Sequence, residues 1–394
     1  MYRLIFILFL FLGSRANASG FDTIPFAKMD SITYSLYLKG DWEMLRNVGY
    51  DLIKQDVDWY YLRLRLAEAE LQLNRPSYAL KNISKAEVFS GRNSLTNDLL
   101  VRANLVRDCY QEALFVSSRD SSSEYFHALN KNKFLKQYDI EGVLRGSSLI
   151  SQGLFTGARV GFTSYLNKRF SIYLSGQVYS QKNSLSDSLN NSNSIVVQQR
   201  QVYGKAKMLL SPAFSLFGGA QYSVLKYEKE NSTNYIAFVG TELRKPFMNY
   251  KLSAASTNFK GDSKIIGTLS ITAFPLGNLN FYPWMNFSNV YCLDSLTNSP
   301  VVDFGVGGKL MKNVWADIFF SPLAYEFHTL NDYEVVFNVQ DKVNHKLGFG
   351  LSYYGFKHTA VKFNYSRESM QLLGAPSVLN YTQNTITLCI SRYR

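Results

Sequence analysis

The spacing of apolar residues along the chain changes near residue 137. Before that point, apolar residues recur at the interval of an amphipathic helix. After it, they alternate with polar residues, as in a half-buried strand whose side chains point to opposite faces in turn. We therefore predict an α-helical N-terminal part followed by a β-rich C-terminal part.

The helical part repeats itself. The pairs Met44-Leu45, Ala79-Leu80 and Ala113-Leu114 lie 35 and 34 residues apart, and each follows a turn-like segment. A period of about 34 residues with two helices per unit is typical of tetratricopeptide repeats, in which stacked units bury the apolar faces that one helical hairpin leaves open. The predicted helices cover residues 29–39, 41–55, 58–73, 77–87, 94–105 and 109–117, with a closing helix near 121–134.

Solenoid repeats commonly present a concave surface to a peptide or protein. A run of aromatic and basic residues in the second unit supplies the candidate partner-binding residues of such a groove: Trp59, Tyr60, Arg63 and Arg65. The same run fits a helix core with a solvated face equally well. The whole helical part also fits a rigid appendage that only packs on the part that follows.

Beyond residue 137, one segment after another alternates with a period of two. Leu174 and Val178 belong to an apolar face, whereas Ser175 and Gln177 belong to a polar one. Many such segments of about ten residues are the signature of a transmembrane β-barrel. A soluble β-domain also alternates, but its strands average about 5–6 residues. The predicted strands here run to roughly 11–14 residues, well beyond that average.

The connections between these segments alternate between short turns and long polar loops, among them the loop 328–342. Outer-membrane barrels keep short turns in the periplasm and long loops outside, and bacterial single-chain barrels have an even number of strands. Counting back from a last strand that descends to Tyr393 predicts about 14 strands and places residue 137 in the periplasm. The predicted fold is thus an α+β membrane protein: an N-terminal α-helical tetratricopeptide-like repeat domain, then an antiparallel transmembrane β-barrel.

Composition agrees with a barrel and adds an export signal. Aromatic residues make up 15% of the chain, and several, including Tyr165 and Tyr179, fall at predicted strand ends as if in interfacial girdles. The apolar run Leu4 to Leu12 is too short to span a membrane as a helix. It follows Arg3 and precedes the small-residue site Ala16-Asn17-Ala18, an order that predicts a signal peptide. The expected division is 1–18 signal peptide, 19–135 periplasmic helical domain and 138–394 outer-membrane barrel.

Charged residues within the predicted strands fall mostly on the polar face. A charge that faces lipid at mid-depth costs about 2–4 kcal/mol, so the strand phase places these side chains in the lumen. Both a water-filled pore with a mild preference for anions and a lumen closed by salt bridges fit this pattern. The predicted lumen-lining residues are Arg145, Arg159, Lys205, Lys207, Glu242, Arg244, Lys251, Asp303, Lys309, Asp317, Lys346 and Lys362.

The sequence gives little support for other classes of function. The net charge is +12, but the basic residues form no block, which disfavours nucleic-acid binding. The three cysteines are far apart, so we expect neither a disulfide framework nor a metal site. There is no Gly-rich phosphate loop and no nucleophile elbow, and the spacing of the four histidines forces no catalytic pairing. We predict a protein that is not an enzyme and has no cofactor.

The order of these parts resembles a family of Bacteroidota outer-membrane β-barrel proteins with an N-terminal tetratricopeptide-like periplasmic domain. The likeness is carried by Tyr37–Trp42 and Asp58–Ala67 in the helical part, and by Asn167–Ser171 and Leu210–Phe214 in the barrel. The resemblance implies an architecture and a place in the outer membrane, and no particular activity.

Two functions remain open at this stage. In the first, a non-enzymatic outer-membrane barrel uses its periplasmic repeats to recruit a protein partner, as an accessory of an envelope machine for secretion, assembly or uptake. In the second, the barrel is a passive or substrate-specific channel with a mild anion preference. The expected partners are outer-membrane lipid and a periplasmic or envelope protein.

Overall fold

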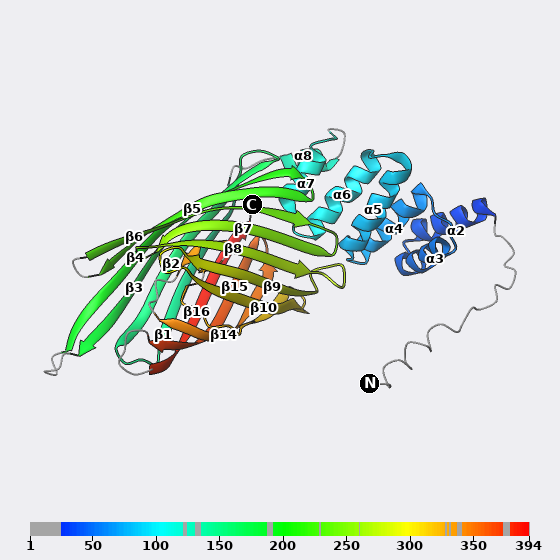
Figure 1. Cartoon of the computed structure of the whole chain (residues 1–394). Coiled ribbons are helices and arrows are strands. Elements are labelled where there is room, and N and C mark those ends of the chain that lie inside the picture. The colour runs from blue at the N-terminus through cyan, green and yellow to red at the C-terminus, as the bar shows by residue number, and fades with distance from the viewer. Residues whose placement is uncertain are drawn as a thin grey trace, which may run out of the picture.

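A helical array extends from one end of a β-barrel (Figure 1). The computed structural model describes residues 25–120, 124–130, 135–186, 192–227, 230–259, 261–327, 329–330, 332–336, 341–372 and 379–393. The predicted signal peptide lies outside the described residues.

The N-terminal part is helical, and its helices lie within a few residues of the predicted ranges. Consecutive helices pack on one another, with α2 and α3 farthest from the barrel (Figure 1). Among the described helices, none combines the length and apolar character needed to cross a membrane. Their assignment to the tetratricopeptide class stays a prediction. The helices are α2 (Phe26–Lys39), α3 (Trp42–Lys54), α4 (Tyr60–Gln72), α5 (Pro76–Ser90), α6 (Ser94–Val106), α7 (Tyr110–Ser117) and α8 (Glu124–Asn130).

Local signals begin and end several of these helices. The Asp41 side chain accepts a hydrogen bond from the Met44 backbone N–H at the start of α3. At the start of α6, Asn93 and Thr96 form a reciprocal capping box. Both arrangements satisfy backbone donors that have no partner inside the helix. Gly40 ends α2 with a φ of 69°, in the left-handed region that favours glycine.

The repeated positions of the sequence lie at the contacts between helices. Leu45, Ala79 and Ala113 are each fully buried. Small side chains let neighbouring helices approach closely, and Gly49 shows how closely: a Cβ there would lie 2.7 Å from Leu66 Cδ2. The period of about 34 residues therefore reflects packing between successive helices, as expected for stacked units.

The C-terminal part is a closed antiparallel barrel of 14 strands, so the predicted barrel and strand number are confirmed. The first and last strands close it, with Ile140 opposite Ile390. Two further short strands, β12 (Thr329–Leu330) and β13 (Val335–Val336), pair only with each other and are not part of this wall. The wall consists of β1 (Leu135–Ser147), β2 (Gln152–Tyr165), β3 (Phe170–Ser186), β4 (Ser192–Ser211), β5 (Phe214–Tyr227), β6 (Glu230–Arg244), β7 (Met248–Phe259), β8 (Asp262–Ala273), β9 (Phe281–Cys292), β10 (Thr297–Met311), β11 (Val314–Ser321), β14 (Lys342–Phe356), β15 (Thr359–Leu372) and β16 (Leu379–Tyr393).

The predicted strand phase agrees with the two faces of the wall. Leu174 and Val178 are exposed on the outside, whereas Ser175 and Gln177 are buried on the inside. Outward apolar side chains recur on the other strands, as a barrel embedded in lipid requires. The girdle assignment of two tyrosines is wrong: Tyr165 and Tyr179 both line cavities inside the barrel.

The connections at the end of the barrel that carries the helices, which we call the helical end, are two to seven residues long (Figure 1). The opposite end, which holds the longest connection, between β11 and β14, is the loop end. At the helical end, the N–H of Ser77 donates to the carbonyl of Gly277 over 3.0 Å, and the ring of Tyr78 packs against Phe247. Arg107 donates to the carbonyl of Lys245. Helices α5 and α6 are thus fixed to two turns of the barrel.

The outward face can be tested against lipid with two neighbouring residues of β16. Leu388 points outward near mid-strand, and Thr387 points into the lumen. Leu388→Arg should lower the free energy of unfolding in lipid vesicles by about 2–4 kcal/mol, because it places a charge in hydrocarbon. Thr387→Arg, the control, should cost much less. Equal losses in denaturant titrations of the two variants would contradict the assigned lipid-facing side.

Candidate functional site in the barrel lumen

Most of the predicted lumen-lining residues do face the interior, where they surround two cavities or lie buried against the wall. Arg145 and Arg159 are buried, and Arg145 lies over the ring of Phe155. Lys362 is half-buried, and Lys309 is exposed beside Trp315 near the helical end. The cavity-lining members of the set are Lys205, Lys207, Glu242, Arg244, Lys251, Asp303, Asp317 and Lys346.

The connection between β11 and β14 folds into the barrel, which corrects the expectation that the loop 328–342 lies outside. Its short strands β12 and β13 form a hairpin, and residues 332–334 at its tip contact the inner wall. We call these three residues the loop tip. Near the root of the connection, Tyr325 pairs with Val343 through two backbone hydrogen bonds of 2.8 Å each.

Asp332 anchors the loop tip to two strands. Its carboxylate lies 2.6 Å from the ammonium of Lys205 on β4 and 2.6 Å from that of Lys251 on β7. Its carbonyl also accepts a hydrogen bond of 3.0 Å from the hydroxyl of Tyr203. One loop residue therefore forms ion pairs with two of the predicted lumen cations.

Glu334 anchors the tip to the neighbouring strands β2 and β3. Its carboxylate lies 2.7 Å from the guanidinium of Arg159 on β2, which also pairs with Glu141. The hydroxyls of Tyr173 and Ser175 each donate to the same carboxylate over 2.7 Å. Charge-assisted hydrogen bonds of this kind are about twice as strong as neutral ones.

Tyr333 lies between these two acids and packs into an aromatic cluster. Its ring centroid is 5.1 Å from that of Phe238. Its hydroxyl lies 3.0 Å from Ser253 Oγ and donates to Thr268 over 3.3 Å. The loop tip as a whole thus contacts wall residues from β2 through β8.

A second intrusion comes from the helical end, where α7 covers part of the barrel mouth. Glu112, almost fully buried, lies 2.9 Å from Arg244 and 3.3 Å from Lys207. Arg244 also donates to the sulfur of Cys109, whose thiol pKa is raised by burial. The Tyr110 ring stacks on Tyr165 at 5.7 Å. Helix α7 is therefore bound to the wall by ion pairs and by ring stacking.

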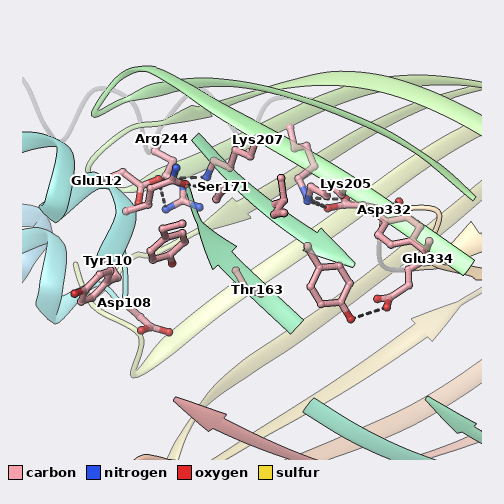
Figure 2. A pocket seen from close by; sticks show the side chains of 16 residues that line it. Asp108, Tyr110, Glu112, Thr163, Ser171, Lys205, Lys207, Arg244, Asp332 and Glu334 are labelled. Carbon is pink, nitrogen blue, oxygen red and sulfur yellow. Dashed lines mark hydrogen bonds and ion pairs between the residues drawn. The ribbon is translucent and has the colours of Figure 1, made fainter. Parts of the chain in front are cut away.

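The loop tip separates two cavities within the lumen. The smaller, of about 520 Å³, lies between α7 and the tip, and Figure 2 shows Glu112 and Arg244 at one side of it and Asp332 and Glu334 at the other. The larger, of about 580 Å³, lies against β7–β11 and β14–β16 and reaches the tip at Asp332 and Tyr333. Both volumes fall within the ~300–1,000 Å³ of small-molecule sites.

Glycines keep this interior open. Several inward aromatic rings lie over a glycine of the neighbouring strand, where a Cβ would overlap the ring. A ring that lies flat on the wall occupies less of the lumen than one that points toward its axis. The pairs are Trp284 with Gly305, Phe319 with Gly348, Phe217 with Gly240 and Tyr179 with Gly157.

The four candidate groove residues of the helical domain are engaged in contacts between helices. Arg63 is buried and forms a two-point ion pair with Asp58, while Arg65 lies 2.7 Å from Asp30. Trp59 also donates to Asp30, and the Tyr60 hydroxyl accepts from Asn93. These side chains therefore hold the helices together, and their part in a binding groove stays a prediction.

Two sets of residues were missed by the sequence analysis: the acids of the loop tip and Glu112 of α7. Strand phase identifies inward wall residues, but it says nothing about loops or about a helix that enters the mouth. The only available signal was the length of the loop 328–342, since long loops are often functional.

The described residues offer little for catalysis or metal binding. Among them, no group of three or more His, Cys, Asp or Glu residues is placed to hold a metal ion. His127 is exposed on α8, and His358 lies in a turn with a φ of 57°. The three cysteines are buried and unpaired with one another.

Comparisons with known proteins add only weak similarities. No protein family and no curated protein matches the chain. Among solved structures, the toluene transporter TodX of Pseudomonas putida has a TM-score of 0.46 at 8% identity, covering 66% of this chain and 89% of its own. A Pseudomonas aeruginosa FadL homologue has 0.43 at 9%, covering 66% and 90%, and CdiB of Acinetobacter baumannii has 0.39 at 9%, covering 66% and 60%.

Similarities this weak assign neither a ligand nor an activity, so the function has to be inferred from the chain's own geometry. The resemblance to Bacteroidota barrels likewise stays a prediction.

The contact between α7 and the wall can be measured with a double-mutant cycle. Glu112→Ala and Arg244→Ala should each destabilise the packing of α7, because each removes the ion pair between α7 and the wall from a largely buried charge cluster. The double variant should lose less than the sum, with a coupling energy of about 2 kcal/mol. Chemical denaturation followed by the helical circular-dichroism signal measures this. Strictly additive losses would show that the pair contributes nothing to docking.

Proposed function

We propose that this protein is a bacterial outer-membrane channel for small solutes, held closed by the loop tip. The observation that carries the proposal is the pair of cavities on either side of a tip attached through side-chain contacts. A lumen of 14 strands exceeds what the wall side chains of an eight-stranded barrel fill. A loop that enters such a lumen and can leave it fits a gated channel better than it fits a purely structural barrel.

The orientation forms part of the proposal. The longest connection, between β11 and β14, lies at the loop end, and outer-membrane barrels carry their long loops on the exterior side and their short turns on the periplasmic side. The helical domain then lies in the periplasm, and α7 partly covers the periplasmic mouth. A solute from outside meets the loop tip first and α7 second.

The anion preference expected from the wall alone is not part of this proposal. Asp332, Glu334 and Glu112 bring carboxylates to Lys205, Lys251, Arg159, Arg244 and Lys207. With these partners, the basic excess of the wall is largely neutralised, so ion charge becomes a weak criterion for passage.

Releasing the loop tip should open the channel. The double variant Asp332→Ala/Glu334→Ala removes the carboxylates that bind Lys205, Lys251 and Arg159, and should raise open probability in planar bilayers at least about tenfold, the equivalent of about 1.4 kcal/mol. Asp262→Ala, which removes an exposed carboxylate at the loop end, should leave conductance unchanged. A folded, inserted double variant that stays silent would refute the channel.

Recruitment of an envelope protein is a second candidate, favoured by the outermost helix. Phe26, Tyr34 and Leu38 of α2 are 58%, 49% and 65% exposed, although terminal units of helical arrays normally carry a polar outer face. A photo-crosslinker in place of Tyr34 in the full chain should trap one envelope protein in living cells. The same group at Lys54, an exposed polar position of α3, serves as the control. Identical adducts at both positions, or none at either, would remove this candidate.

A further inference from the structure

The larger cavity has one wall that differs from the rest of the lumen. Inward positions of β7, β8 and β9 bring together Asn249, Ser270, Thr272, Asn286 and the ring of Trp284, and we call these five residues the hydroxyl–amide patch. Strand register makes them neighbours: Thr272 is opposite both Asn249 and Trp284, and Ser270 is opposite Asn286. The patch is therefore a continuous surface across three strands.

Several polar groups of this patch have hydrogen-bond donors and acceptors without a partner in the described part of the protein. Within the described residues, the side chains of Ser270, Thr272 and Asn286 form no hydrogen bond with protein, and all three are half-buried at the cavity. Together they offer hydroxyl and amide groups that both donate and accept. The Trp284 ring lies close over Gly305, where a Cβ would be 2.7 Å from its Cζ2 atom, and the side chain lines the cavity beside these polar groups.

Most charged side chains around the same cavity form ion pairs. Glu242 pairs with Arg244 and Lys207, Glu368 pairs with Lys346 over 2.7 Å, and Asp332 pairs with Lys205 and Lys251. Among the described residues, no ion pair within 4.0 Å is found for the lining acid Asp317, and Asp303, which lies opposite Asn286 of the patch, accepts a hydrogen bond from the hydroxyl of Ser321. Most of the lining charges thus already have a partner in the protein, whereas the open hydroxyl and amide groups of the patch can still select for hydrogen-bonding partners.

We infer that the larger cavity is a binding subsite for a neutral, hydroxyl-rich solute, such as a mono- or disaccharide. The solute's hydroxyl groups exchange hydrogen bonds with Ser270, Thr272 and Asn286, and its apolar C–H face lies against the ring of Trp284. This inference rests on the proposed channel, of which it names the substrate class. An aliphatic solute would leave the hydroxyl and amide groups without partners, which is costly in a partly desolvated site.

Maltose, a neutral disaccharide, is the probe. Saturation-transfer NMR on the full chain in detergent should show saturable binding of maltose at millimolar concentrations. Neither laurate, an aliphatic acid, nor 1,5-diaminopentane, a dication that would seek Asp317, should compete. Ser270→Ala/Asn286→Leu should weaken maltose binding at least about tenfold through two lost hydrogen bonds. Thr163→Ala, an inward hydroxyl of the smaller cavity, should leave binding unchanged.

The outcomes separate this inference from the channel itself. No saturable maltose binding, binding that the patch variant does not weaken, or tighter binding of laurate or diaminopentane would each overturn the inference. The channel would survive any of these if the loop-tip variant conducts. Maltose binding that depends on the patch, in a barrel that stays silent with its tip released, would support the subsite and refute the channel.

Discussion

Closure of the sheet is the constraint on which everything else depends. Hydrocarbon offers no hydrogen-bond partners, so every backbone N–H and C=O within a bilayer has to be satisfied by the chain itself. Pairing of β1 with β16 removes the last open edge of the wall. Once the wall is closed, side chains alternate between lipid and lumen, and polar residues gather inside. A barrel of this size then has space that its own wall does not fill, and the loop tip and α7 both enter that space.

Much of this was predictable because it follows from local periodicity. The alternation at Leu174, Ser175, Gln177 and Val178 gives the face of β3 without any knowledge of its neighbours. Turn and loop lengths give the strand number, since each connection is a local feature. The helices were found in the same way, because the buried positions Leu45, Ala79 and Ala113 recur at a fixed interval.

What could not be predicted depends on contacts between residues far apart in the sequence. Asp332 reaches Lys205 across 127 residues, and Glu334 reaches Tyr173 across 161. No local pattern marks a loop for folding inward. Arg63 shows the converse error: a basic residue in an aromatic run looks like part of a binding surface, but Asp58 and Asn82 hold it in the interior. Tyr165 and Tyr179 were misplaced because an aromatic ring at a strand end fits an interfacial girdle and a lumen cluster equally well.

The ion pairs that hold the loop tip in the lumen also set the free energy needed to release it. Breaking a buried pair by removing one partner costs about 3–5 kcal/mol, whereas exposed pairs are worth only about 0.2–1 kcal/mol. The loop tip lies between these limits, because cavities large enough for water adjoin Asp332 on both sides. As the tip leaves, Lys205 and Lys251 become accessible to water. The free energy needed to separate them from Asp332 therefore falls during the movement. A neutral solute in the larger cavity takes no part in those ion pairs. Such a solute can still contact the tip at Tyr333, whose hydroxyl is bound to Ser253 and Thr268 beside the hydroxyl–amide patch.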